Sequence, residues 1–125
     1  MSDKPPILRV RTVNFSRDII AFCKSEQQTI VTRPLINQLT RAATSIGANY
    51  AEASNAASRS DFRNKIFIAK KETAETEYWL TLFADVAVDS KTCNKLAEEC
   101  HYLLMTFQKI INTLSNGSRL TDKVR

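Results

Sequence analysis

One segment of the chain, from Thr40 to Ser58, combines helical spacing with an unusual share of small side chains. Of its 19 residues, TRAATSIGANYAEASNAAS, 13 are Ala, Ser, Thr or Gly. A helix covered by such small side chains lets a second backbone approach closely, because the distance between packed helices depends on the side chains at the contact. The segment therefore predicts close packing of helix on helix.

The composition of the whole chain also favours helices. Its 125 residues include only two Gly and three Pro, and so few breakers favour long helices over many short strands. The length suits one domain with one core of ordinary size. No stretch is apolar enough to span a membrane and the N-terminus lacks the apolar core of a signal peptide, so a cytoplasmic protein is expected.

Apolar spacing predicts four helices, over residues 8–24, 34–56, 61–87 and 90–115, followed by a mobile basic tail over 118–125. Short connections between long helices favour antiparallel neighbours. The predicted fold is all-α, a single-domain antiparallel four-helix bundle with up-down-up-down topology.

Each predicted helix carries an apolar seam for the core. The first has Val10, Val13, Ile20 and Cys23, with Phe15, Ile19 and Phe22 on an adjoining stripe. The other three seams keep a heptad-like spacing. They contain Leu35, Leu39, Ala42, Ile46, Asn49 and Ala53; Phe62, Ile66, Ala69, Thr73, Thr76, Leu80, Phe83 and Ala87; and Cys93, Leu96, Cys100, Leu103, Phe107, Ile110 and Leu114.

Capping residues give the expected helix ends. Thr32 is predicted to cap the second helix, Ser60 with Asp61 the third, and Asp89 or Ser90 the fourth. Asn116-Gly117 is expected to end the fourth helix.

The third predicted helix has more apolar residues than one core-facing side needs. Phe67, Ile68, Tyr78, Trp79 and Leu82 fall outside its seam, which predicts a second buried surface. We expect Phe67, Tyr78 and Trp79 to take part in an oligomer contact.

Three polar residues of the small-residue segment have fixed offsets. Arg41 and Glu52 share a helix face but lie about 16 Å apart along it, at about 1.5 Å per residue, so their partners must come from another helix or subunit unless both are solvated. Asn49 lies in the seam, where an unpaired amide is costly, so we expect it to bond to the backbone or to Glu52 and to fix register.

The run from Arg41 to Glu52, RAATSIGANYAE, resembles the RRAAxSIPxNIAEG segment of the bacterial four-helix-bundle proteins encoded within intervening sequences of large-subunit ribosomal RNA genes. The likeness extends through Ser60-Asp61-Phe62 and the long third helix. Gly47 stands where the family usually has proline, and Ala53 where it usually has glycine, so the kink and the helix exit there can differ.

The resemblance implies an assembly, because relatives of this family form pentameric rings. A more distant group resembles the accessory proteins of diversity-generating retroelements, which pair with a reverse transcriptase and nucleic acid. The resemblance therefore implies a ring-like homo-oligomer and suggests a nucleic-acid context with a reverse transcriptase as partner. It implies no catalytic activity.

Candidate metal or catalytic groups are sparse. Glu98-Glu99-Cys100-His101 contains the Glu-x-x-His spacing of di-iron bundles, but such a site needs two of these motifs and His101 is the only histidine. Cys23, Cys93 and Cys100 form no CxxC pair and lie at apolar positions, so we interpret them as reduced core thiols. We expect no metal, no cofactor and no enzyme.

The charge is unevenly distributed. In an antiparallel bundle, residues 1–15, 50–67 and 108–125 gather at one end and carry ten basic and four acidic residues, whereas the rest carries eight and nine. Such an end suits RNA or DNA phosphates. The predicted contacts are Arg9, Arg11, Arg59, Arg63, Lys65 and Arg119. The alternative is a structural oligomer or interaction scaffold whose basic residues only keep it soluble.

Overall fold

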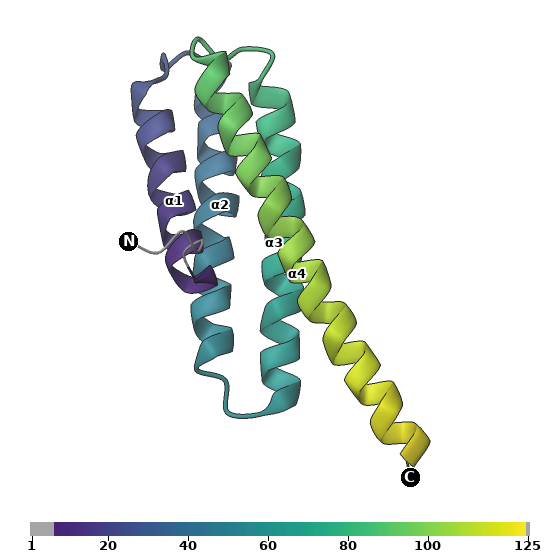
Figure 1. Cartoon of the computed structure of the whole chain (residues 1–125). Coiled ribbons are helices and arrows are strands. Elements are labelled where there is room, and N and C mark those ends of the chain that lie inside the picture. Colours follow the sequence, from purple (N-terminus) through teal and green to yellow (C-terminus); the bar gives the residue numbers. More distant parts are fainter. Residues whose placement is uncertain (1–6, 125) are drawn as a thin grey trace, which may run out of the picture.

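The computed structural model describes the backbone of residues 7–124 and the side chains of residues 7–116. Within that range it contains four helices and no strand: α1 (Leu8–Ser25), α2 (Thr32–Ser54), α3 (Arg59–Phe83) and α4 (Ser90–Val124). Consecutive helices run in opposite directions, and α1 also packs against α4 (Figure 1). The all-α prediction is confirmed. None of the described helices has the length and apolarity that a membrane crossing requires.

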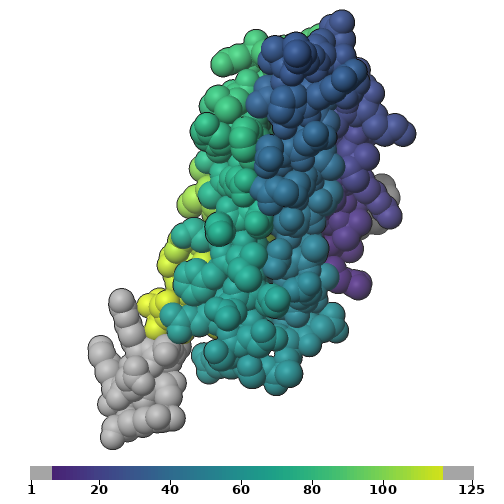
Figure 2. All heavy atoms as spheres, turned by 180° about the vertical axis from the view of Figure 1, so that it is seen from behind, coloured from purple at the N-terminus to yellow at the C-terminus, as the bar shows by residue number. Residues whose placement is uncertain are grey.

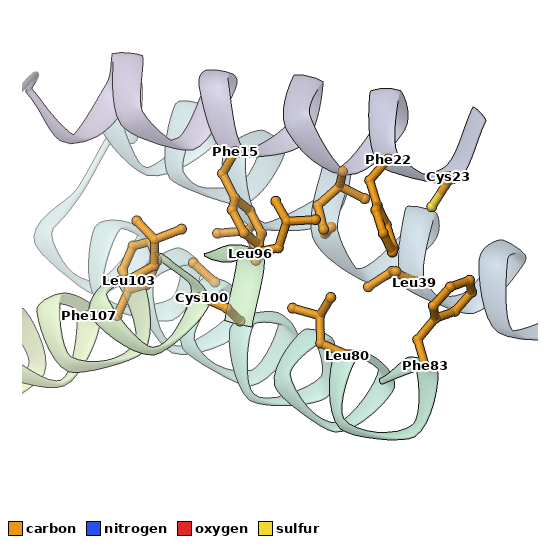
Figure 3. Close-up of a cluster of buried hydrophobic side chains, with 14 of the residues drawn as sticks. Phe15, Phe22, Cys23, Leu39, Leu80, Phe83, Leu96, Cys100, Leu103 and Phe107 are labelled. Carbon is orange, nitrogen blue, oxygen red and sulfur yellow. The ribbon is translucent and has the colours of Figure 1, made fainter. Parts of the chain in front are cut away.

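The core lies between the four helices, each of which contributes side chains to it (Figure 3). Most residues of the seams predicted for α2, α3 and α4 are buried as expected, including Leu39, Leu80 and Leu103. Near the end of the α4 seam, Ile111 is buried and Ile110 only partly so. A straight helix has 3.6 residues per turn, so its buried face drifts away from a strict seven-residue repeat.

The seam predicted for α1 is wrong at Val10, Val13 and Ile20, which are exposed, whereas its fourth residue, Cys23, is buried. The bundle buries the adjoining stripe of Phe15, Ile19 and Phe22, whereas Val10 and Val13 are about 40 % exposed. Both stripes are apolar, but the phenylalanines remove more apolar surface from water when they are buried. Phe22 accordingly makes an edge-to-face contact with Phe83 of α3, with ring centroids 5.3 Å apart.

The hydrogen bonds show that the caps predicted for α2 and α3 are wrong. The Thr29 hydroxyl oxygen accepts from the backbone N–H of Thr32, and the Thr32 hydroxyl instead donates to the Gln27 carbonyl at 2.6 Å. Ser58 replaces Ser60 as the cap of α3, since its hydroxyl accepts from the Asp61 N–H at 3.0 Å.

Three further helix ends can be compared with the prediction. The Asp89 cap of α4 is confirmed, because its carboxylate accepts from the Thr92 N–H. Helix α3 ends at Phe83, four residues before the predicted end. Helix α4 does not stop at Asn116-Gly117 but continues to Val124, since glycine lowers helix propensity without forbidding a helix.

The small-residue segment does bring two helices close together. A Cβ added at Gly47 of α2 would lie 3.5 Å from the Thr12 side chain of α1. One turn away, the Ser16 hydroxyl reaches the Ala43 carbonyl at 3.5 Å. Helix α2 runs unbroken through Gly47.

Candidate nucleic-acid interface

The end of the bundle at the α2–α3 turn carries a local excess of basic side chains. Helix α2 ends there, α3 begins there, and the second half of α4 passes beside them (Figure 1). Arg59 and Arg63 follow each other by one turn on α3, and Lys109 lies on α4. All three side chains are exposed.

Arg59, Arg63 and Lys109 line two hollows that share Leu114, one between α3 and α4 and one along α4. The first hollow, of about 220 Å³, is lined by Arg59, Ser60, Arg63 and Leu114. The second, of about 420 Å³, is lined by Lys109 with apolar and threonine side chains, and Leu114 belongs to both. We call Arg59, Arg63 and Lys109 the basic triad. Among the described side chains, no carboxylate lies within 4.0 Å of any of these three cationic groups.

Lys65 belongs to the same end but is paired. Its ammonium lies 2.7 Å from the Glu52 carboxylate across the α2–α3 turn. The hydrogen bond to Glu52 raises the pKa of Lys65, so the lysine stays charged while its charge is locally compensated.

Arg9 and Arg11 do not join the basic triad. Helix α1 begins only at Leu8, level with the middle of α4, where the Arg11 guanidinium makes an ion pair with Glu99 at 2.8 Å and covers the Tyr102 ring at 3.6 Å. The hydrogen bonds that the Arg11 guanidinium donates to Glu99 raise the pKa of Arg11. Arg9 is exposed in the same turn of α1. The side chain of Arg119, the last predicted contact, lies outside the described residues.

Polar residues of the small-residue segment find partners inside the chain. The Arg41 guanidinium lies against the carboxylates of Glu72 and Glu75 on α3, and the predicted partner on another helix is thus confirmed. The Glu52 contact with Lys65 confirms the same prediction for the second charge. Asn49 donates to the Ser45 carbonyl at 2.8 Å, which confirms its predicted backbone bond.

The apolar residues outside the α3 seam divide into two groups. Phe67 is 41 % exposed and Tyr78 57 % exposed. Trp79 is half-buried against the core, and its indole N–H donates to the Glu75 carboxylate at 3.3 Å. Phe67 and Tyr78 thus remain open to solvent along α3, whose surface is seen beside α2 in Figure 2.

Groups that could support metal or thiol chemistry are dispersed or buried. The described residues contain no group of three or more His, Cys, Asp or Glu placed to hold a metal ion. His101 is exposed and contacts Glu77 at 3.3 Å. The three cysteines are free and buried, as predicted, and burial raises the pKa of Cys100 to about 12.

The chain is similar to known proteins in sequence and in fold. Residues 9–115 match the model of the 23S rRNA-intervening sequence protein family. The chain belongs to that family. Its fold is similar to the crystal structure of a protein of unknown function from the S23 ribosomal protein family of Bacteroides thetaiotaomicron VPI-5482, with a TM-score of 0.73 and 31 % sequence identity. The alignment covers 84 % of this chain and 98 % of that chain. A comparison with functionally curated proteins found no match.

Family membership accounts for the fold and the small-residue segment. The sequence analysis counted Lys109 in the basic end but did not name it as a contact, and it missed Glu26 as a buried acid. Lys109 could have been named from the exposed face of α4, because Glu98, Met105 and Lys109 follow at helical spacing.

Proposed function

We propose that this family member acts in the cytoplasm as a non-enzymatic protein that binds RNA or DNA phosphates through the basic triad. The observation that carries the proposal is the position of Arg59, Arg63 and Lys109 around adjoining hollows, with no described carboxylate near enough to neutralise them. Guanidinium and ammonium groups bind phosphate oxygens through charge-assisted hydrogen bonds.

Filter binding of a short RNA and of a DNA of the same sequence, over a salt series, tests this proposal. The wild type should bind more weakly as salt rises, because each phosphate contact releases counterions. The triple variant Arg59→Gln, Arg63→Gln and Lys109→Gln should lose most of the affinity and flatten the slope of log K against log salt by about 0.7 to 0.9 for each lost contact.

A matched control removes three exposed basic residues near the opposite end of the bundle. The variant Lys24→Gln, Arg33→Gln and Lys91→Gln has the same net charge as the triad variant. Binding that falls equally in both variants would show a response to total charge alone, and binding that ignores salt would overturn the phosphate mechanism.

The homo-oligomer is a further part of the proposal. The outward face of α2 carries exposed Ala48 and Ala51, and such small side chains permit close approach of a second copy. A ring, with five copies favoured by the family resemblance, would repeat the basic triad and strengthen binding through multivalency. Light scattering that reports only the 14.1 kDa monomer at micromolar concentration would refute the oligomer.

The reverse transcriptase suggested by the retroelement resemblance enters as a proposed partner. Its encoding gene should lie beside the gene of this protein, and the two proteins should copurify. A gene position inside a ribosomal RNA operon, with no reverse transcriptase nearby, would speak against this partner.

A second candidate function is a structural oligomer or interaction scaffold without a nucleic-acid role. The exposed Phe67 and Tyr78 on α3 favour it, since exposed apolar clusters often mark protein contacts. In this case the triad variant should keep its partner binding and its oligomeric mass unchanged.

A further inference from the structure

The outward face of α3 carries cations and aromatic rings in alternation. Arg63, Phe67, Lys71, Ala74 and Tyr78 follow at spacings of four, four, three and four residues, which place them on one face of a helix. All five are exposed. We call this set the α3 outer stripe, and it extends about 22 Å along the helix at about 1.5 Å per residue.

The stripe continues the basic triad. Arg63 belongs to both, and its guanidinium lies 5.6 Å from the centroid of the Phe67 ring. At the far end, the Tyr78 ring meets the Trp79 indole edge to face with centroids 5.1 Å apart. The Trp79 indole donates a hydrogen bond to Glu75, which restrains the ring that Tyr78 packs against.

The three glutamates of α3 contact other helices. Glu72 and Glu75 turn toward α2, where Arg41 binds both. Glu77 turns toward α4, where it contacts His101. The five residues of the α3 outer stripe therefore offer positive charge and aromatic surface and include no acidic residue.

We propose that the α3 outer stripe binds single-stranded nucleic acid, with unpaired bases stacked on Phe67 and Tyr78 and phosphates held by Arg63 and Lys71. The proposal rests on the proposed nucleic-acid function and names its substrate class. Aromatic side chains beside a positive track are the means by which proteins bind single strands without reading sequence. A duplex keeps its bases paired and stacked inside, so it can use the cations but not the rings.

A two-fold contact between the stripes of two copies fits less well. It would bury Arg63 and Lys71 beside their own counterparts, and burying unpaired charges is strongly unfavourable. A polynucleotide supplies the opposite charge and the flat apolar surface together.

Fluorescence anisotropy with a labelled single-stranded RNA, the matching single-stranded DNA and the RNA duplex tests the proposal. Phe67→Ala and Tyr78→Ala should each weaken binding of the single strands about tenfold and leave duplex binding nearly unchanged. Their salt slopes should stay at the wild-type value, whereas Lys71→Gln should flatten the slope by about 0.7.

Conservative variants and a control separate stacking from folding. Phe67→Tyr and Tyr78→Phe retain a ring and should bind single strands like the wild type. Val13→Ala removes a comparably exposed apolar side chain from α1, 43 % exposed, and should have no effect. Circular dichroism should show that all variants remain folded.

Three other outcomes would each contradict a named part of the proposals. If the triad variant loses binding but Phe67→Ala and Tyr78→Ala do not, the stacking proposal is overturned and phosphate binding stands. If the wild type binds none of the three probes, the proposed function fails as well. If the ring variants change the oligomeric mass in light scattering, the stripe is a protein interface and the stacking proposal is overturned.

Discussion

Glu26 is an acidic residue buried at one end of the bundle, with only 5 % of its surface exposed. It follows α1, and its carboxylate oxygens accept hydrogen bonds from the backbone N–H groups of Val88 and Asp89, each at 2.9 Å. Glu26 thus ties the end of α1 to the loop before α4. Nothing local in the sequence indicates this role, because the two donors come from a loop more than sixty residues away.

Replacing this single side chain should be costly. Glu26→Ala leaves two backbone donors without their partner, and we expect the free energy of unfolding to fall by about 1 to 3 kcal/mol. Glu26→Gln keeps one acceptor oxygen and should lose less. Urea denaturation measures both, with the exposed Glu98→Ala as control at no more than about 0.5 kcal/mol. A Glu26→Ala value equal to that control would contradict the assigned role.

Between elements, the contact of α1 with α2 is close but has room for one methyl group at Gly47. The nearest atoms to an added Cβ, all from Thr12, lie at 3.5 to 3.6 Å, which is ordinary van der Waals contact. Gly47→Ala should therefore stabilise the protein by about 0.5 to 1 kcal/mol through higher helix propensity.

Thermal unfolding of Gly47→Ala tests that expectation. The reverse change on the neighbouring exposed position, Ala48→Gly, supplies the matched control and should cost about 1 kcal/mol. A destabilised Gly47→Ala would mean that α1 and α2 need a closer approach than the structure shows.

The contact of α2 with α3 should be sensitive to acid. Hydrogen bonds from Arg41, and then from the Trp79 indole, lower the pKa of Glu75 from its ordinary value of 4.5. A lowered folded-state pKa contributes stability above pH 4.5 that is lost as pH falls through the folded value. Urea unfolding from about pH 7 to about pH 3 should show Glu75→Gln to be less acid-sensitive than the wild type. Parallel pH profiles would contradict this account.

Over the whole molecule, the sequence predicts the seams of α2 and α3 well, because each keeps one continuous heptad-like spacing. For α1 it offers two apolar stripes, and only packing against Phe83 and its neighbours selects the one with Phe15 and Phe22. The position of Arg11 could not be predicted, since it depends on where α1 starts relative to α4. Caps such as Thr29 and Ser58 depend on loop conformation, which periodicity does not contain.

Burial of all three thiols is a property of the complete bundle and can be measured at once. Cys23, Cys93 and Cys100 are at most 5 % exposed, and burial raises the pKa of each. A thiol reagent such as Ellman's reagent at about pH 8 should not react with the folded protein, since the thiolate is the reactive form. Three equivalents should react after unfolding in urea. Rapid reaction of the folded protein would show that the bundle opens readily.

The connections at the two ends of the bundle differ in how they are secured. Glu26 holds the loop before α4 and the threonine hydroxyls hold the loop before α2, whereas the short turn between α2 and α3 is bracketed by the Glu52–Lys65 pair and by the Ser58 cap. A peptide inserted between Ala56 and Ala57 would leave the ion pair and the Ser58 cap in place. This turn is therefore the natural position for an internal tag or a new pair of chain ends, and the opposite loops are the positions to leave intact.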